Sequence, residues 1–370
     1  MTKVKFEDVA TRVNTREDRL NTSLLYYVGG EHIESNEMLV QGCGLIKGST
    51  IGPMFYCGFK KGDILLVSRN PHLRKASMVE FDGICSEKTF VLGTKDSKVL
   101  LQEFLALVMQ SDDFWNYCEE HKSGGVNYFL NWSTLAKYEF YLPSIQEQKE
   151  IADKVWSAYR LKESYKKLLV ATDEMVKSQF IEMFENVESY CKLEDLVSDT
   201  FPGEWGSEPI SENAIKVIRT TNFTNEGYLD LTDVVTRDIE PKKVVRKKLK
   251  QGDTILERSG GTKDNPVGRV VFFDEIGDYL PNNFTQVLRP KESVNPVYLF
   301  YALYNSYNLN KAAMRAMASQ TTGIQNLSMS DFMAKFIVLP SRNEQNKFEQ
   351  IYRQADKSKF ELKQCIENID

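Results

Sequence analysis

The residues best suited to chemistry in this sequence are arginines that follow short apolar runs and stand in loops rich in hydrogen-bond donors. Arg69, Arg219 and Arg258 all have this position. Arginine, asparagine, glutamine, serine and threonine can hydrogen-bond the edges of bases or hold phosphates, and neighbouring glycines let the backbone come close. A single serine, threonine or glycine in such a loop is more simply an ordinary polar turn. The three arginines therefore carry the hypothesis of DNA binding.

Polar loops of this kind occur at matching places in the two halves of the chain. The second half has loops 219–222, 258–263 and 320–326, and the first half has loops 29–32, 69–75 and 123–128. Two sets of loops predict that one recognition task is performed twice. The residues expected to contact DNA are Arg69, His72, Arg74, Lys75, Asn127, Arg219, Thr221, Asn222, Arg258, Ser259, Lys263, Thr322 and Gln325.

The distribution of charge bears on this hypothesis more than the net charge does. The net charge of −5 argues weakly against a nucleic-acid partner, but clustering of basic residues on one face matters more. The run 241–250 contains six lysines and arginines and stands beside the second Gly-Asp pair. A basic run is usually a solvated surface. Its placement here favours a role in DNA binding, with Lys242 to Lys250 setting the salt dependence.

A search for catalytic patterns finds none that is complete. There is no Gly-rich phosphate loop ending in Lys-Ser/Thr and no Gly-x-Ser-x-Gly elbow. Asn265-Pro266-Val267 begins like an adenine methyltransferase motif, but it lacks the second proline and the aromatic residue on which a flipped base stacks. The three histidines stand in no metal-like or triad-like setting. We therefore expect no catalytic residue, metal ligand or cofactor in this chain.

Cysteine usage and hydropathy indicate the compartment. The six cysteines are scattered without a Cys-x-x-Cys pair, which is typical of reduced thiols and indicates neither a disulfide framework nor a zinc site. No apolar run approaches the roughly 20 residues that cross a bilayer, and the first residues lack a signal-peptide pattern. A cytoplasmic protein with no membrane partner is expected.

An internal repeat fixes the architecture that positions the loops. Three motifs occur twice, with offsets of 187, 190 and 197 residues. They are Lys5-Phe6-Glu7-Asp8-Val9 with Lys192-Leu193-Glu194-Asp195-Leu196, Gly62-Asp63 with Gly252-Asp253, and Leu142-Pro143-Ser144-Ile145-Gln146-Glu147-Gln148 with Leu339-Pro340-Ser341-Arg342-Asn343-Glu344-Gln345. A repeat of this length predicts two copies of one folded unit.

Each copy ends in a long helical pattern. Residues 144–185 contain no Gly or Pro, and about 42 residues at ~1.5 Å each make a rod of roughly 60 Å that needs a partner helix. Heptad spacing of apolar and small residues predicts the seam. The seam residues are Ile151, Ala158, Leu161, Tyr165, Leu168 and Met175 in the first rod and Phe348, Ile351, Ala355, Ser358, Leu362, Cys365 and Ile369 in the second. Ile151, Leu161, Leu168, Met175, Phe348 and Leu362 are predicted to bind partners.

The fold expected is therefore α+β, with two similar α/β domains separated by two long antiparallel helices that form a coiled coil. The expected segments are a first recognition domain at 1–143, a central helix at 144–186, a second recognition domain at 187–340 and a C-terminal helix at 341–370. The second rod is about a dozen residues shorter than the first. Either this chain is short here, or the far end of the first rod is unpaired, or another partner covers 170–184.

With these motifs, the chain resembles the specificity subunit of type I restriction–modification systems. The resemblance is carried by Leu142 to Ile151, Val217 to Leu231, Lys250 to Gly260, Lys61 to Lys75 and Phe81 to Ser86. It implies that two target-recognition domains each read one half of a split, asymmetric DNA sequence. It also implies that the paired helices fix the spacing and dock two modification subunits. S-adenosylmethionine, ATP and Mg²⁺ would then bind the modification and restriction subunits.

Two other functions compete with this interpretation. One is a coiled-coil scaffold with two protein-interaction domains and no DNA binding. The other is a stand-alone DNA methyltransferase or nuclease, which requires a methyl-donor pocket or a metal-binding carboxylate cluster that the sequence does not contain.

Overall fold

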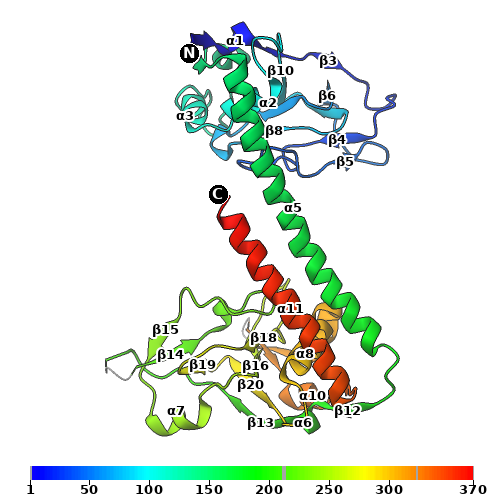
Figure 1. Cartoon of the computed structure of the whole chain (residues 1–370), viewed down its shortest axis with the longest axis vertical. Helices are drawn as coiled ribbons and strands as arrows, with labels where there is room; N and C mark the ends of the chain where they lie inside the picture. Colours follow the sequence, from blue (N-terminus) through cyan, green and yellow to red (C-terminus); the bar gives the residue numbers. More distant parts are fainter. Residues whose placement is uncertain (1, 211–213, 322–323, 370) are drawn as a thin grey trace. The chain divides into compact units, whose positions relative to one another are not determined.

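The computed structural model describes residues 2–210, 214–321 and 324–369 and divides into two compact units (Figure 1). Unit 1 extends to Ser164 and unit 2 extends from Tyr165 to Asn368. The division falls inside the longest helix, α5 (Ile145–Phe184), which contributes its first half to unit 1 and its second half to unit 2. The division between the two units therefore lies within α5 and at neither of its ends.

Unit 1 contains two sheets, a two-stranded pair and short helices. Its sheet orders are β2-β10-β7-β8 and β3-β6-β9-β4-β5, and β1 pairs with β11. The elements are β1 (Thr2–Lys5), α1 (Phe6–Val9), β2 (Ala10–Arg12), β3 (Thr15–Arg16), β4 (Tyr26–Val28), β5 (Gly44–Leu45), β6 (Phe55–Phe59), β7 (Ile64–Val67), η1 (Pro71–Leu73), β8 (Ala76–Met78), β9 (Gly83–Ser86), β10 (Thr89–Thr94), α2 (Gln102–Val108), α3 (Asp112–Glu120), α4 (Trp132–Leu135) and β11 (Glu139–Leu142).

The described residues of unit 2 form three sheets and a two-stranded pair, β12 with β23. The sheet orders are β13-β20-β16-β18, β15-β14-β19 and β17-β22-β21. The elements are β12 (Tyr190–Lys192), α6 (Leu193–Leu196), β13 (Val197–Pro202), β14 (Ile215–Ile218), η2 (Thr220–Asn222), β15 (Val235–Arg237), α7 (Pro241–Lys247), β16 (Asp253–Glu257), β17 (Ser259–Gly260), β18 (Val270–Phe273), β19 (Tyr279–Pro281), β20 (Thr285–Pro290), α8 (Pro296–Leu309), α9 (Lys311–Ala316), β21 (Ala318–Thr321), β22 (Ile324–Leu327), α10 (Met329–Met333), β23 (Phe336–Val338) and α11 (Arg342–Glu367).

The two units repeat one topology. The four-stranded sheet β2-β10-β7-β8 of unit 1 corresponds to β13-β20-β16-β18 of unit 2, strand by strand in chain order. The antiparallel pair β1–β11 corresponds to β12–β23, and the parallel pair β4–β9 corresponds to β14–β19. The expected α+β fold with two similar domains is confirmed.

The repeated Ser-x-x-Glu sequence begins each long helix with a capping box. In α11, Ser341 Oγ accepts from Glu344 N at 3.4 Å, and Glu344 Oε2 accepts from Ser341 N at 2.9 Å. In α5, Glu147 Oε2 accepts from Ser144 N at 2.9 Å. Backbone donors at a helix start have no partner inside the helix, so these side chains fix both start points.

The glutamine that follows each capping glutamate is buried and connects two helix starts. Gln148 Oε1 accepts from Leu101 N at 3.0 Å, and Gln345 Oε1 accepts from Asn295 N at 2.8 Å. Leu101 and Asn295 are the N-cap residues of α2 and α8. Each glutamine also donates to the carbonyl of the motif's proline, at 3.0 and 2.9 Å. The repeated Glu-Gln pair is therefore structural.

The repeated Gly-Asp pair forms the same tight turn in both units. Gly62 and Gly252 both have φ of +93°, a conformation that favours glycine. The next residue, Asp63 or Asp253, accepts a 2.8 Å hydrogen bond from the backbone N–H three residues earlier. The turn leads into the central strands β7 and β16, so the motif places the start of a core strand.

Asp63 gives the first prediction, on pH dependence. Burial raises the pKa of Asp63, and Asp82 nearby raises it further, against the lowering effect of the Lys60 N–H. Because the folded pKa exceeds the unfolded value, the stability that Asp63 contributes is complete below the unfolded pKa and is lost as pH rises through the folded pKa. Asp63→Asn should therefore raise the thermal unfolding midpoint at pH 7.5, and raise it less at pH 5. A variant no more stable than the wild type at pH 7.5 would contradict this.

The second half of α5 lies antiparallel to α11 within unit 2 (Figure 1). Lys359 Nζ is 2.7 Å from Asp173 Oδ1, while nearer the start of α11 the Phe348 ring lies 5.0 Å from that of Phe180 and 5.9 Å from that of Phe184. The contacts move forward along α5 as they move back toward the start of α11, which requires opposite helix directions. The predicted pairing of the two helices is confirmed in this unit.

The register of the seam differs from the prediction in α5. The side chains of Ile151, Leu161, Leu168 and Met175 are each 40–50% exposed. Trp156 packs in the core of unit 1, and Val176 and Phe184 pack in the core of unit 2. The large aromatic side chains Trp156 and Phe184 are buried in the cores of the two units. The buried face of α5 is therefore set by these residues and not by the heptad positions.

The buried face of α11 is also wider than a two-helix seam. Phe348 and Ala355 are buried as predicted, but Tyr352 is buried where Ile351 was expected. The ring of Tyr352 lies 6.1 Å from that of Phe300 in α8. Because α11 packs against α8 as well as α5, its apolar stripe extends beyond the heptad positions.

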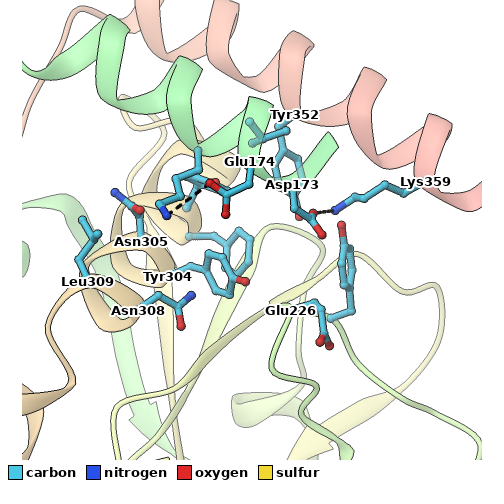
Figure 2. A pocket seen from close by; sticks show the side chains of 14 residues that line it. Asp173, Glu174, Glu226, Tyr304, Asn305, Asn308, Leu309, Tyr352 and Lys359 are labelled. Carbon is cyan, nitrogen blue, oxygen red and sulfur yellow. Dashed lines mark hydrogen bonds and ion pairs between the residues drawn. The ribbon is translucent and has the colours of Figure 1, made fainter. Parts of the chain in front are cut away.

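A cavity of about 230 Å³ lies between α5, α8 and α11 beside the Asp173–Lys359 ion pair (Figure 2). Tyr301, Tyr304 and Glu226 are among its lining residues. Burial raises the pKa of Tyr304, with the charge of Asp173 adding to the effect. The Tyr304 phenol therefore stays neutral at physiological pH. Helices α8 and α11 thus cover one face of the segment 170–184. One of the three expectations for this segment was that an additional partner covers it.

Candidate nucleic-acid interface

Two of the three predicted loops of unit 2 are joined by a small sheet. Strand β17 pairs with β22, with Ser259 opposite Asn326 and Gly260 opposite Gln325. Ser259 Oγ donates to Asn326 Oδ1 at 2.7 Å. The loop at 258–263 and the segment that ends at Asn326 therefore lie side by side.

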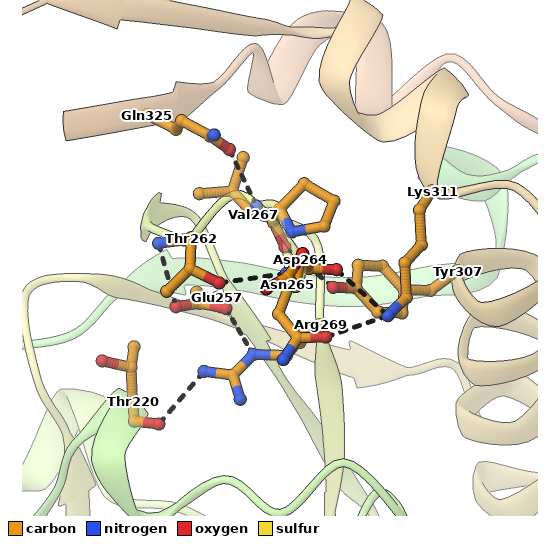
Figure 3. Close-up of polar contacts among 12 residues, drawn as sticks. Thr220, Glu257, Thr262, Asp264, Asn265, Val267, Arg269, Tyr307, Lys311 and Gln325 are labelled. Atoms are coloured by element: carbon orange, nitrogen blue, oxygen red, sulfur yellow. Dashed lines mark hydrogen bonds and ion pairs between the residues drawn. The ribbon is translucent and has the colours of Figure 1, made fainter. Parts of the chain in front are cut away.

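A buried ion pair connects these loops to the third one (Figure 3). Arg269 Nε donates to Glu257 Oε2 at 2.7 Å, and Arg269 Nη2 donates to the Thr220 carbonyl at 3.3 Å. Glu257 is 2% exposed, and its Oε1 accepts from Gly261 N at 3.4 Å. The Glu257 carboxylate and the Arg269 guanidinium thus hold together three segments, which are η2, the end of β16 and the loop after β17. Neither residue was among the predicted site residues. Glu257, a charged residue at the end of the apolar strand β16, was the signal in the sequence that could have indicated it.

The loop 261–268 is held by its own side chains, by α9 and by β22 (Figure 3). Asn265 N donates to Thr262 Oγ1 at 3.0 Å, and Lys311 Nζ donates to Asn265 Oδ1 at 2.9 Å. Val267 N donates to Gln325 Oε1 at 3.3 Å. Asn265-Pro266-Val267 is therefore part of a structural loop, and Lys263 is exposed on it.

The two arginines of unit 2 that were predicted to contact DNA, Arg219 and Arg258, differ in how tightly the domain holds them. Arg219 is 23% exposed at its side chain, and its Nη2 lies 2.8 Å from Asp233 Oδ2. Arg258 is half-buried, and its side chain makes one hydrogen bond to the described residues, a long one from Nη1 to Gln286 Oε1 at 3.4 Å. Arg258 is therefore the arginine freer to reorient toward a ligand.

Two predicted contact residues have structural roles instead. Asn222 is 3% exposed and its Nδ2 donates to the carbonyls of Asp230 and Asp233 at 2.9 and 3.0 Å. Ser259 is 7% exposed and its hydroxyl bonds Asn326. Burial and internal hydrogen bonds leave neither side chain free to reach DNA. Thr221 is exposed, and Thr322 lies outside the described residues.

The three predicted loops of unit 1 also converge. Lys75 Nζ donates to the Gly30 carbonyl at 2.7 Å, which joins loop 69–75 to loop 29–32. Asn70 N donates to the Tyr128 carbonyl at 3.0 Å, which joins loop 69–75 to loop 123–128. The Arg69 guanidinium lies 5.2 Å from the ring centroid of Phe129. The arrangement matches that of unit 2, although the bonds are made by different residues.

The remaining predicted residues of unit 1 lie around this junction. Arg74 has φ of +49° and its Nη1 lies 2.7 Å from Asp112 Oδ1. His72 and Asn127 are exposed. Lys75 uses its ammonium to fix the Gly30 loop, so it is a positioning residue in this conformation.

The basic run 241–250 does not lie beside the Arg219 loop. Its first seven residues form α7, and the Leu249 N–H after this helix donates to the carbonyl of Tyr279 at the start of β19. Strand β14 runs parallel to β19 and leads into Arg219 at its far end. Lys243 and Lys247 both pair with Glu204, at 3.3 and 2.6 Å. Strand β14 therefore separates this run from the Arg219 loop.

Within residues 2–210, 214–321 and 324–369, no group of three His, Cys, Asp or Glu side chains is placed to hold a metal ion. Among the helices of the same described residues, none combines the length and apolar character needed to span a membrane.

Comparisons with known proteins agree with this architecture. The family model for the type I restriction modification DNA specificity domain matches twice, at residues 27–169 and 200–369. A crystal structure of a type I restriction-modification S subunit from M. genitalium has a TM-score of 0.65 at 14% identity, covering 100% of this chain and 92% of the other. A structure described as showing complex assembly and conformational transition of the type I R-M system has a TM-score of 0.52 at 17% identity, covering 100% and 96%. A search of curated proteins gives no match. Because the family model covers most of the sequence in two copies, the chain belongs to the type I restriction–modification DNA specificity family.

Proposed function

We propose that this chain is the sequence-recognition subunit of a type I restriction–modification complex, in which each unit reads one half of a split, asymmetric DNA target. The observation that carries the proposal is the duplicated junction of three loops. In unit 2 the loops are joined by Glu257 and Arg269, and in unit 1 by Lys75 and Asn70. Rigid loops rich in donors are suited to both phosphate and base-edge contacts. Different sequences at the two junctions suit two different half-sites.

The helix pair is proposed to fix the spacing between half-sites and to dock two methyltransferase subunits. A groove of about 550 Å³ runs between α5 and α11 and is lined partly by Met175, Ile351 and Ala355. The exposed side chain of Leu168 lies one heptad before Met175 in α5. Apolar side chains left in water on a helix pair are typical of a protein-binding surface. The partner subunits would carry S-adenosylmethionine, ATP and Mg²⁺.

Co-expression with a type I modification subunit, followed by methylation mapping of the host genome, tests the proposal. The expected result is methylation at one two-part sequence with a constant gap. A complex that forms but methylates at no defined sequence would favour a protein scaffold instead. Binding of S-adenosylmethionine by the isolated chain, measured by calorimetry, would favour a stand-alone methyltransferase.

Lengthening the helices should change the gap and leave both half-sites unchanged. One heptad inserted into α5 near Ser164 and one into α11 after Leu362 add about 10 Å to each helix. That is about three base pairs at ~3.4 Å per pair. Methylation mapping of this variant should therefore report the same half-sites with a longer gap. An unchanged gap would refute the spacing role.

Arg258→Ala should weaken recognition of one half-site only. If Arg258 reads a base, affinity for the matching target should fall by about 1–3 kcal/mol, with relaxed preference at one position. Arg69→Ala is the matched control, because it should affect the other half-site. Competition binding of the assembled complex with targets altered at single positions measures both effects. Equal losses on every DNA sequence would identify Arg258 as a phosphate contact.

A further inference from the structure

Two cysteines of unit 1 stand opposite each other on neighbouring strands. Strands β6 and β9 pair antiparallel. Their register shifts between Phe55 and Cys57 and is regular from there to Phe59, with Cys57 opposite Cys85. Opposed residues in an antiparallel pair have Cα atoms roughly 4.5–5.5 Å apart and side chains on the same face. A disulfide bridges Cα atoms about 4.4–6.8 Å apart. The backbone therefore already provides the spacing that a disulfide requires.

The surroundings make the two thiols chemically different. Cys57 is half-buried, and a hydrogen bond from the Cys85 thiol, aided by the charges of Arg12 and Arg16, lowers the pKa of Cys57 to about 7 against the effect of burial. Cys85 is 0% exposed, and the Cys57 thiolate and burial raise its pKa. The thiolate is the reactive form of cysteine. Cys57 is thus the thiol that meets an oxidant, and Cys85 is the neighbour that can resolve the product.

We propose that Cys57 and Cys85 form a reversible oxidation site that closes a disulfide when a peroxide reaches the protein. The Cys57 thiolate attacks one peroxide oxygen and breaks the O–O bond, giving a sulfenic acid and, after protonation, one water. The Cys85 sulfur then attacks the Cys57 sulfur. The S–O bond breaks, and hydroxide leaves with the Cys85 proton as a second water. Two thiols and one hydrogen peroxide give one disulfide and two waters, and a thiol reductant reverses the reaction.

The position of this site connects it to one half of the molecule. Strand β9 also pairs with β4, with Val28 opposite Cys85, and β4 leads directly into the loop 29–32. A disulfide would therefore link β6 to β9, which is the strand that pairs with β4 next to this loop. The counterpart of β9 in unit 2 is β19, which contains no cysteine. Oxidation at this place concerns unit 1 alone.

The test is oxidation of the full chain followed by peptide mapping. Cys43→Ser and Cys365→Ser form the background, because both residues are exposed and would react independently. The protein is treated with hydrogen peroxide, its remaining thiols are alkylated, and the digest is analysed by mass spectrometry. The expected result is a peptide pair linked through Cys57 and Cys85, with two fewer alkylated thiols, that dithiothreitol separates.

Single variants separate the two roles. Cys85→Ser should leave Cys57 as a sulfenic acid that dimedone traps, and Cys57→Ser should leave Cys85 alkylated only after denaturation. Circular dichroism tests whether each variant is folded. If a variant is unfolded, the peptide map of the Cys43→Ser, Cys365→Ser protein alone tests the proposal. The proposal is overturned if peroxide leaves Cys57 and Cys85 unlinked while other thiols oxidise, or links either of them to another cysteine.

Discussion

Asp253→Ala is expected to destabilise unit 2 by about 3 kcal/mol. Asp253 is 1% exposed and receives two hydrogen bonds from Arg289, Nε to Oδ1 at 2.8 Å and Nη2 to Oδ2 at 2.7 Å. Removing one partner of a buried pair leaves an uncompensated charge and costs roughly 3–5 kcal/mol. We expect the lower end because the Arg289 side chain is 16% exposed and can recover part of its hydration.

The internal repeat provides a matched control for this variant. Asp63 occupies the same turn of unit 1, and it forms no ion pair with any of the residues that the structure describes. Asp63→Ala should therefore cost much less. Amide hydrogen exchange followed by mass spectrometry reports each unit separately, with β16 and β20 in unit 2 and β7 and β10 in unit 1. Equal losses of protection for the two variants would show that the turn, and not the ion pair, sets the stability.

The repeat and the helix starts could be predicted because they depend on local sequence. A Ser-x-x-Glu pattern makes its capping bonds within one helical turn, and a Gly-Asp turn needs only a glycine at positive φ. Ser341, Glu344 and Gly252 accordingly act where the patterns indicated. The repeat also placed polar loops at matching points of the two halves, because equivalent strands lead into them.

The residues that fix the loops could not be predicted, because their partners are distant in sequence. Glu257 meets Arg269 only when β16 and the start of β18 are side by side, and Asn222 finds its carbonyl partners only when the 230–233 turn folds over it. The composition of its loop made Asn222 look like a base-reading side chain. The side chain is instead buried, and it holds the loop together by its hydrogen bonds to backbone carbonyls. The seam register failed for a related reason, since Trp156 and Phe184 respond to the cores of their units.

Arg269→Ala is expected to have the largest effect on recognition, because it removes the centre of the unit 2 junction. Glu257 would keep its charge at 2% exposure without a cation, at a cost of about 3–5 kcal/mol, and Thr220 would lose its link to β16. The loops 219–222 and 258–263 would then lose their fixed relation. Methylation mapping should show loss of the second half-site preference while that of the first half-site remains.

A double variant distinguishes loss of the ion pair from loss of the arginine itself. If the buried charge of Glu257 causes the destabilisation, adding Glu257→Gln to Arg269→Ala should recover part of the stability, since a neutral amide is far less costly to bury and can still accept from Gly261 N. Arg315→Ala is the control, because Arg315 is exposed and donates to the carbonyl of Lys263, which is also exposed. Recovered stability without recovered half-site preference would show that Arg269 positions the loops by its bond to Thr220. Recovery of both would show that the buried charge alone disorders them.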